Sequence, residues 1–277
     1  MSRGQKKIAT INDFCGFGRC SIMAATPIVS ALKIQCCPLP TAIFSNHTGF
    51  PSFFRTDFTE YMNAYMDEWK KLDLHFEGIL TGYLGSREQI ALIRRFFEIF
   101  YEEGKTVAVV DPVMGDYGKL YPTYTLELAR EIKGLLPRAD ILTPNLTEAC
   151  VLADVDYNHD MSDEKILDLC RKLSAIGPSK IVVTGLERGD RLDNFVYERD
   201  SEPEIISVDK IGPCRSGTGD VFSAILAADA VNGLSVVEST RRASDFIVKI
   251  MRRAVELDLP LTYGACFEEF LTELTVR

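Results

Sequence analysis

A short glycine-rich stretch in the last third of the chain combines the residue types that phosphoryl transfer requires. Gly217-Thr218-Gly219-Asp220 stand directly before the apolar helical pattern 221–228. The start of a helix leaves backbone N–H groups without intrahelical partners, and glycines let a phosphate approach them closely. A carboxylate beside that phosphate, here Asp220, could take a proton from an attacking hydroxyl. The alternative is an ordinary helix N-terminus in which Asp220 complements the helix dipole.

Polar residues elsewhere in the chain favour the phosphate site over the ordinary helix start. Ligands of parallel-sheet proteins bind beyond the carboxyl ends of the strands. Polar groups follow the strand-like runs of this chain repeatedly, which packing alone does not explain. They are Asn12-Asp13, Asn46-His47-Thr48, Thr81-Gly82-Tyr83, Asp111, Thr143-Pro144-Asn145, Thr184-Gly185 and the stretch 215–220. We therefore predict a ligand site at this edge of a sheet.

Two acidic patterns point to a divalent cation. Asp111-Pro112-Val113-Met114-Gly115-Asp116 places two carboxylates around a turn after an apolar strand. Mg²⁺ takes oxygen ligands, usually one or two carboxylates together with substrate phosphates. We therefore favour Asp111 and Asp116 as metal-binding residues over a purely structural turn. Asn145 with Glu148 three residues later is typical of a capping box. Glu148 could also hold the water shell of a metal, and the sequence leaves both readings open.

Other chemistries receive less support. The glycine-punctuated segment Gly115–Tyr121 fits either a mobile lid that excludes water or a surface loop. For Cys214 we favour an inert packed thiol over a nucleophile. Three histidines and the absence of G-x-S-x-G argue against a His-rich metal site and a serine triad. Neither standard nucleotide motif is present, because Gly16-Phe17-Gly18 lacks the third glycine and no P-loop occurs. A kinase here must use another phosphate cradle.

Composition excludes several classes of partner. The 277 residues carry a formal net charge of −9, and no basic block is present, so a nucleic-acid partner is not expected. No apolar run approaches a membrane span, and the apolar run after the basic start, Ile8–Ile11, is too short for a signal peptide. The eight cysteines are scattered without a C-x-x-C pair. We therefore expect a reduced, cytoplasmic protein.

Strand-like and helix-like runs alternate along the chain and predict an α/β fold, a mostly parallel sheet with helices on both faces. We expect one domain over residues 1–277. The expected strands are Lys7–Ile11, Ile34–Leu39, Gly78–Thr81, Thr106–Val110, Ile141–Thr143 and Lys180–Thr184, with a hairpin of Phe195–Tyr197 and Ile205–Asp209. The expected helices are Ser21–Leu32, Asp57–Leu72, Glu88–Tyr101, Leu126–Leu136, Thr147–Ala153, Glu164–Ala175, Asp220–Asn232, Val236–Glu256 and Phe267–Leu274, and Thr41–Phe53 is expected to be irregular.

Taken together, these motifs resemble the ribokinase-like superfamily and, within it, the pyridoxal (vitamin B6) kinases. The resemblance runs from about Ile8 to Ala228 and rests on five segments in the family's order. These segments are Ser45-Asn46-His47-Thr48-Gly49, Thr81-Gly82-Tyr83, Asp111–Asp116, Thr143-Pro144-Asn145-x-x-Glu148 and Gly217-Thr218-Gly219-Asp220. It implies a ribokinase-like fold, an ATP-dependent kinase with Mg²⁺, often aided by a monovalent cation (K⁺ or Na⁺), and commonly a homodimer.

The resemblance also implies roles for individual residues. Asp220 would activate the substrate's 5′-hydroxymethyl group, while Gly217, Thr218 and Gly219 would stabilise the transferring phosphoryl group. Thr48 and Tyr83 would contact the pyridine ring of the substrate, and we predict Asp13 and His47 as further substrate-binding residues. ATP would be bound by Asp111, Asn145, Glu148, Thr184, Thr218 and the lid residue Tyr121, and the metal by Asp111, Asp116 and Glu148.

One residue departs from the family pattern. Many pyridoxal kinases carry a serine after the first strand, near the substrate ring, where this chain has Asp13. We expect Asp13 to pair with a protonated ring nitrogen or with the aminomethyl group of pyridoxamine. The departure keeps a hydroxymethylpyrimidine kinase of thiamine synthesis open as an alternative. A non-catalytic nucleotide- or B6-binding protein that kept the fold is a separate alternative, against which the intact Asp220 argues. A sugar kinase is less well supported, because the early chain lacks a glycine pair of the sugar-binding type.

Overall fold

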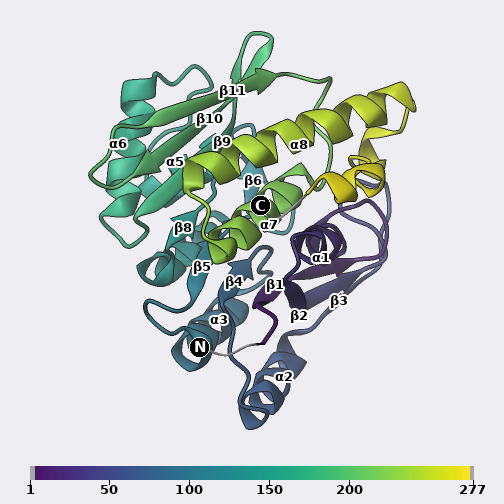
Figure 1. The fold of residues 1–277 in the computed structure, drawn as a ribbon, viewed down its shortest axis with the longest axis vertical. Helices are drawn as coiled ribbons and strands as arrows, with labels where there is room; N and C mark the ends of the chain where they lie inside the picture. The colour runs from purple at the N-terminus through teal and green to yellow at the C-terminus, as the bar shows by residue number, and fades with distance from the viewer. Residues whose placement is uncertain (1–3, 275–277) are drawn as a thin grey trace.

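The computed structural model describes residues 4–274, so the first three residues of the basic start lie outside the described part. Within residues 4–274, one sheet of nine strands forms the centre of the protein (Figure 1). From one edge to the other, its strands are β11 (Glu204–Asp209), β10 (Arg191–Glu198), β9 (Lys180–Arg188), β8 (Ile141–Leu142), β5 (Val107–Val110), β4 (Gly78–Thr81), β1 (Lys7–Cys15), β2 (Gln35–Phe44) and β3 (Arg55–Asp57).

The six strands from β9 to β2 run parallel, and only the outer strands β3, β10 and β11 pair in antiparallel fashion. Parallel strands must be joined by crossovers, which place helices on the faces of the sheet. Strand β5, Val-Ala-Val-Val, shows the result, because three of its four side chains are buried and none is polar. The predicted mostly parallel α/β sheet is confirmed.

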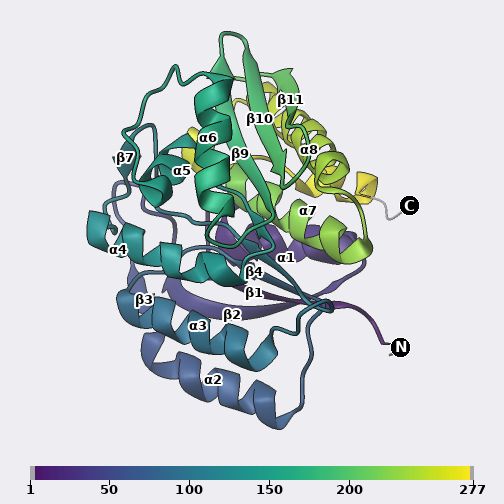
Figure 2. The ribbon, with the colours of Figure 1, turned by 90° about the vertical axis from the view of Figure 1, so that its left-hand side faces the viewer.

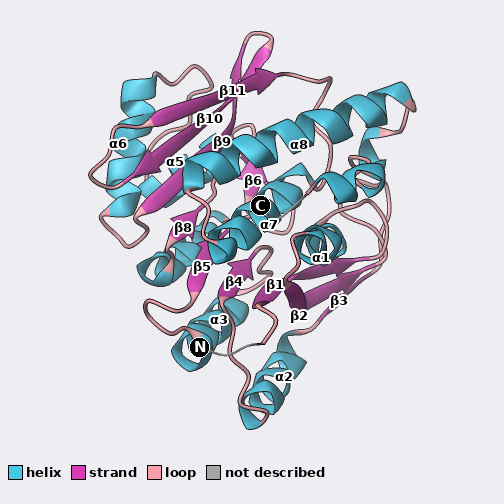
Figure 3. Ribbon diagram, viewed as in Figure 1, coloured by secondary structure: helices cyan, strands magenta, loops and turns pink. Residues whose placement is uncertain are grey.

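Helices cover both faces of the sheet, as Figures 2 and 3 show. One face carries α1 (Ser21–Ala31), α7 (Thr218–Asn232) and α8 (Val236–Glu256). The other carries α2 (Thr59–Lys71), α3 (Arg87–Phe100), α4 (Leu126–Glu131), α5 (Leu146–Ala153) and α6 (Asp163–Ser174). Each layer encloses its own apolar core, with Ile28, Leu226 and Ile250 on the first face and Phe96 and Leu169 on the second. Burial of this apolar surface stabilises the two layers against the sheet.

Several strands are longer than predicted. Strand β1 continues past Ile11 through a register shift, so Asn12 and Asp13 lie within its carboxyl-terminal end rather than after it. Thr41–Phe44, predicted to be irregular, belongs to β2, because β1 and β3 supply backbone partners on its two sides. The hairpin of β10 and β11 is confirmed with longer strands, while the antiparallel pairing of β9 with β10 was not predicted.

Three helix predictions were wrong in part. The run 126–136 is α-helical only as far as Glu131 and continues as the 3₁₀ segment Ile132–Arg138, which contains Gly134 and Pro137. Both residues weaken an α-helix, and proline lacks the N–H that the helix needs. The last predicted helix is the 3₁₀ segment Glu268–Glu273. Asp57 ends β3, so α2 begins at Thr59 rather than at Asp57.

Candidate active site

A cavity of about 660 Å³ opens at the carboxyl ends of the parallel strands. Its walls take residues at or near the carboxyl ends of the strands β1, β4, β5 and β8, and from the middle of β9. These residues are Asn12, Tyr83, Asp111, Thr143 and Thr184. The volume is in the range of ordinary ligand pockets. The structure therefore brings together the polar residues that the sequence placed at the strand ends.

The glycine-rich stretch forms the N-terminus of α7, at the floor of this cavity. Gly217 is the N-cap, with a φ of +83°, and a Cβ there would lie 1.9 Å from the carbonyl oxygen of Arg19. Only glycine fits this backbone and this close approach. The first N–H groups of α7 have no intrahelical partners, and their residues line the cavity. The geometry is that of an anion site.

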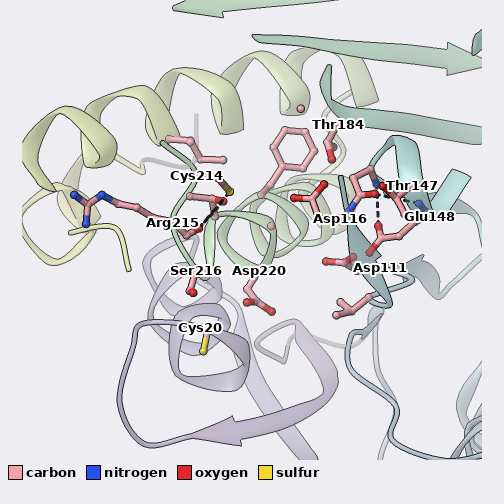
Figure 4. A pocket seen from close by; sticks show the side chains of 18 of the residues that line it. Cys20, Asp111, Asp116, Thr147, Glu148, Thr184, Cys214, Arg215, Ser216 and Asp220 are labelled. Atoms are coloured by element: carbon pink, nitrogen blue, oxygen red, sulfur yellow. Dashed lines mark hydrogen bonds between the residues drawn. The ribbon is translucent and has the colours of Figure 1, made fainter. Parts of the chain in front are cut away.

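Asp220 lies in the first turn of α7 and its carboxylate faces the cavity (Figure 4). Asn12 Nδ2 donates to Asp220 Oδ1 at 3.0 Å and so fixes the orientation of the carboxylate. Burial raises the pKa of Asp220, while hydrogen bonds from the Ser21 backbone and from Asn12 lower it. A held carboxylate with a raised pKa is suited to accept a proton.

Asp111, Asp116 and Glu148 lie on the same side of the cavity, across from Ser216 (Figure 4). Burial raises the pKa of Asp111, and the charge of Asp220 raises it further. Burial, followed by the charge of Asp111, likewise raises the pKa of Glu148. Within residues 4–274, however, no group of three or more His, Cys, Asp or Glu side chains is arranged to hold a metal ion by itself. A metal here would need phosphate or water ligands as well.

The capping box predicted for Asn145 and Glu148 is confirmed. Asn145 Oδ1 accepts from the Glu148 N–H at 3.0 Å, and Glu148 Oε2 accepts from the Asn145 N–H at 2.8 Å. The other carboxylate oxygen of Glu148 accepts from the Met114 N–H at 3.1 Å, and Asn145 Nδ2 donates to the Gly115 carbonyl at 2.8 Å. Both residues therefore hold the 111–116 turn against α5.

The glycine-punctuated segment after that turn is a small hairpin, β6 (Gly115–Asp116) with β7 (Lys119–Leu120). Tyr117, at its tip, donates from its hydroxyl to Glu187 Oε1 at 2.9 Å, and Lys210 Nζ lies 2.7 Å from Glu187 Oε2. Tyr121, like Tyr117, lines the cavity. The hairpin therefore rests against the ends of β9 and β11, and sequence reasoning missed Glu187 and Lys210 because it ended β9 at Thr184.

At the opposite end, the 45–49 segment and the end of β4 form a second part of the cavity. Thr48 and Tyr83 line it, and the Tyr83 ring packs edge-on against Phe44 at 5.9 Å between ring centroids. His47 also lines the cavity, but its Nε2 bonds the Thr262 carbonyl at 2.8 Å and its Nδ1 accepts from the Gly49 N–H at 3.1 Å. These bonds assign the tautomer with the proton on Nε2 and leave only the ring face for a ligand.

Asp13 lies in this second part of the cavity and is 7% exposed. Burial raises its pKa to about 7, helped by the charge of Asp220, while a hydrogen bond to Ser21 and the charge of Arg55 act in the opposite direction. The chain thus has an acidic group here that changes its charge near neutral pH. The sequence drew attention to Asp13 but gave no sign of Arg55.

The part of the cavity along α8 carries a cluster of apolar side chains beside the polar residues Asn194, Asp209 and Lys210. Thr184 stands at its entrance, and Leu192, Val208, Ile211 and the α8 residues Ile247 and Met251 form its walls. Sequence reasoning offered 211–213 and the last helices only as weak candidates for a base-binding slot, because apolar residues on an amphipathic helix give no separate signal. Cys214 also lines the cavity and is exposed, so the packing predicted for its thiol is not found, although the protein atoms around the sulfur raise its pKa and so disfavour the thiolate.

Comparison with known proteins places the chain in a family. Residues 25–261 match the phosphomethylpyrimidine kinase family. The chain therefore belongs to the phosphomethylpyrimidine kinase family, whose solved relatives have the ribokinase-like fold, and it is an enzyme of the phosphotransferase class. The predicted fold, superfamily and enzyme class are thereby confirmed.

Individual relatives add detail. The pyridoxal kinase of Arabidopsis thaliana is 33% identical over 201 residues, which is 68% of this chain and 62% of that protein. A crystal structure from Bacteroides thetaiotaomicron, described as a candidate phosphomethylpyrimidine kinase and containing pyridoxal, is 34% identical with a TM-score of 0.94, covering 98% of this chain and 96% of the other. The pyridoxal kinase of Leishmania donovani with ADP and pyridoxamine, at 23% identity and a TM-score of 0.85 over 98% and 96% of the chains, shares the fold.

Proposed function

We propose that this enzyme phosphorylates the 5′-hydroxymethyl group of a vitamin B6 vitamer with ATP. The observation that carries the proposal is Asp220, held by Asn12 in the first turn of α7 beside the free amides of an anion site. The cavity extends from this point in two directions, to a polar pocket with Asp13 and Tyr83 and to the cluster of apolar side chains along α8. Two ligands could therefore meet at Asp220. The B6 substrate is supported by the name of the Arabidopsis relative and by the pyridoxal in the Bacteroides structure.

In the proposed mechanism Asp220 takes the proton from the hydroxymethyl group as its oxygen attacks the terminal phosphate. The backbone N–H groups at Gly217, Thr218 and Gly219 stabilise the charge that develops on the transferred phosphoryl group. ATP would lie along Thr184 and α8, with Tyr121 of the hairpin covering its phosphates and excluding water.

The residues of the site fit Mg²⁺ bound together with phosphates. Burial and the charge of Asp220 both raise the pKa of the Asp111 carboxyl, so a cation beside it would be favourable, and Thr143 Oγ1 is buried without a hydrogen-bond partner among residues 4–274. Asp111, with Asp116 and the Glu148-held turn nearby, would hold the cation, which neutralises phosphate charge when bound. On the basis of the family resemblance we also propose that a monovalent cation, K⁺ or Na⁺, assists the reaction. Replacing both by tetramethylammonium should then lower turnover.

Asp13 is proposed to face the pyridine ring or an aminomethyl substituent. As a carboxylate it would accept a hydrogen bond from a protonated nitrogen, and as an acid it would donate one to a neutral ring nitrogen. Asp13→Ser should therefore lower kcat/KM more for pyridoxamine than for pyridoxal. Equal losses for the two substrates would contradict this role.

A hydroxymethylpyrimidine is the second candidate substrate, favoured by the family that the sequence matches. Turnover of ATP should be measured with pyridoxal, pyridoxamine, pyridoxine and hydroxymethylpyrimidine, for the wild type and for Asp220→Asn. The matched control is Asp229→Asn, a buried carboxylate nine residues further along α7 that pairs with Arg242 at 2.7 Å outside the cavity.

We expect a B6 vitamer to give the highest kcat/KM and Asp220→Asn to lose at least about 100-fold in kcat, as loss of a general base does. Asp229→Asn should keep the wild-type kcat. If the protein binds these ligands but turns over none of them, it is a non-catalytic binding protein. If Asp220→Asn keeps full activity, the proposed mechanism is refuted.

Homodimer formation and a cytoplasmic location are also proposed. Phe14 and Ile43 are paired neighbours on β1 and β2, and both are more than one third exposed, as are Phe53 and Phe54 near the edge strand β3. This apolar surface is the candidate dimer face, and light scattering of Phe54→Lys against the wild type would test it. The free state of all eight cysteines supports a reducing compartment. No helix in residues 4–274 is both long and apolar enough to span a membrane.

A further inference from the structure

The segment after α8 contacts three separate loops around the cavity. We call residues 259–268 the C-terminal strap. Arg215 of the anion loop, Arg19 of the loop before α1 and His47 of the 45–49 segment each make a side-chain hydrogen bond to its backbone carbonyls. Figure 1 shows this last part of the chain lying beside α1, far from α8's first turn. One short segment thus joins the two ends of the active site.

Arg215 makes the most unusual of these contacts. Its two terminal nitrogens donate to the carbonyls of Pro260 and Leu259, each at 2.9 Å. Among the described residues it is the only lysine or arginine that is buried, at 5% exposure. Its guanidinium points away from the acidic side chains of the cavity (Figure 4). A buried cation bonded to neutral carbonyls is expensive in free energy, so a role beyond stability is expected.

The backbone of Arg215 leads directly into the anion site. Thr218 Oγ1 donates to the Arg215 carbonyl at 3.2 Å, and Gly217 lies two residues further on. The strap also touches this loop through its own backbone, because a Cβ on Gly264 would lie 3.1 Å from the Ser216 carbonyl oxygen. The strap backbone therefore passes close enough to the anion loop that a side chain at position 264 would meet Ser216.

The other end of the strap reaches the substrate pocket. His47 Nε2 donates to the Thr262 carbonyl at 2.8 Å, and Tyr263 packs edge-on against Phe17 with 4.9 Å between ring centroids. Arg19 donates to the Tyr263 carbonyl at 3.0 Å and forms an ion pair with Glu268 at 2.6 Å. The strap therefore holds the loops of the substrate pocket and the anion loop in one arrangement.

We propose that Arg215 is a positioning residue for phosphoryl transfer, which fixes the anion loop to the C-terminal strap and thereby sets the distance between the transferred phosphoryl group and the substrate hydroxyl. The inference rests on the proposed function and deepens it. Misplacement of reacting groups by about 1 Å can reduce a rate on the order of 100-fold without changing the binding of either substrate much. Loss of Arg215 should therefore appear in kcat rather than in KM.

The test compares Arg215→Met and Arg215→Lys with the wild type in steady-state turnover of ATP and the preferred vitamer. Arg215→Met should lower kcat roughly 30- to 100-fold with both KM values within about threefold. Arg215→Lys keeps the positive charge but has one terminal nitrogen where arginine uses two for the two carbonyls, so its kcat should lie between those of the methionine variant and the wild type. ADP affinity, measured by calorimetry, should stay within about threefold for both variants.

The matched control is Arg199→Met. Arg199 also ties a turn to backbone carbonyls, those of Ser174 and Gly177 at 2.6 and 3.1 Å, but outside the cavity. It should lower the melting temperature and leave kcat unchanged. If Arg199→Met lowers kcat as much as Arg215→Met does, then loss of any arginine that bonds backbone carbonyls lowers activity through stability. The inference would then fail.

Arg19→Met, alone and combined with Arg215→Met, tests whether the strap acts as a unit. The combined loss in kcat should be smaller than the product of the separate losses, because both arginines hold the same segment. Purely multiplicative losses, or a wild-type kcat for Arg215→Met, would overturn the inference. Should Arg215→Met fail to fold, a wild-type kcat for Arg215→Lys would overturn it equally. Absence of turnover in the wild type itself would refute the proposed function instead.

Discussion

Replacement of Asp13 by asparagine is expected to stabilise the protein at pH 8 and to do so less at pH 6. Asp13 is 7% exposed, and burial raises its pKa from 3.8 to about 7. Because the folded-state pKa lies above the unfolded value, the folded protein binds the extra proton between pH 4 and 7. Stability is therefore highest below pH 4 and is lost as the pH rises to about 7.

The magnitude follows from the size of the shift. The pKa rise from 3.8 to about 7 means that ionised Asp13 lowers the free energy of unfolding by about 4 kcal/mol. At pH 6 the carboxyl of the folded protein is still mostly protonated, so only part of this loss in the free energy of unfolding is present. The advantage of Asp13→Asn over the wild type should therefore grow by about 1 kcal/mol between pH 6 and pH 8.

The assay is urea unfolding at pH 6, 7 and 8, with Asp245→Asn on the exposed surface of α8 as the control. Equal differences between Asp13→Asn and the wild type at all three values would refute the reasoning, as would a variant that is less stable than the wild type at pH 8. Activity is expected to fall in the same variant. Asp13 would then serve substrate binding although it lowers the stability of the fold.

Three further changes have definite expected outcomes. Gly217→Ala should lower kcat roughly 100-fold and also lower the melting temperature, because a Cβ there would lie 1.9 Å from the Arg19 carbonyl oxygen; unchanged kcat would contradict the anion site. Glu148→Ala removes the acceptor of two backbone N–H groups and should destabilise the protein by about 2–3 kcal/mol in urea unfolding, in addition to any loss of Mg²⁺ dependence. Arg242→Met leaves the Asp229 carboxylate buried without its partner and should cost about 3 kcal/mol at pH 8, with kcat preserved.

The sequence predicted the central part of the sheet well, because buried parallel strands are short apolar runs whose ends are marked by polar residues. Val107–Val110 followed by Asp111 is the clearest case. The outer strands were predicted less well. Thr41–Phe44 carries no apolar alternation, and its strand conformation depends on β1 and β3, which lie elsewhere in the chain. Tertiary pairing of this kind cannot be read from a local pattern.

A similar division holds for the candidate site. Asp220, Asp111 and Tyr83 could be identified because their residue types and positions after strands are unusual in themselves. The contacts of Arg215 and His47 could not, since both bond to backbone carbonyls of the strap, and a backbone carbonyl has no signature in the sequence. The sequence therefore predicts His47 as a ligand-binding residue, whereas in the structure both of its ring nitrogens have protein partners.

The hydrogen bond between His47 and Thr262 can form only after the ribosome has added Thr262, long after His47. The two residues are separated by 215 positions along the chain. At about 5–20 residues per second, the ribosome needs on the order of 10–40 s to add the intervening chain. For that interval the segment around His47 exists without the residues that hold it in place. During that time its aromatic neighbours Phe50 and Phe53 lack the C-terminal strap and are open to chaperones or to aggregation. The contact between the 45–49 segment and the C-terminal strap can therefore form only once nearly the whole chain has been made.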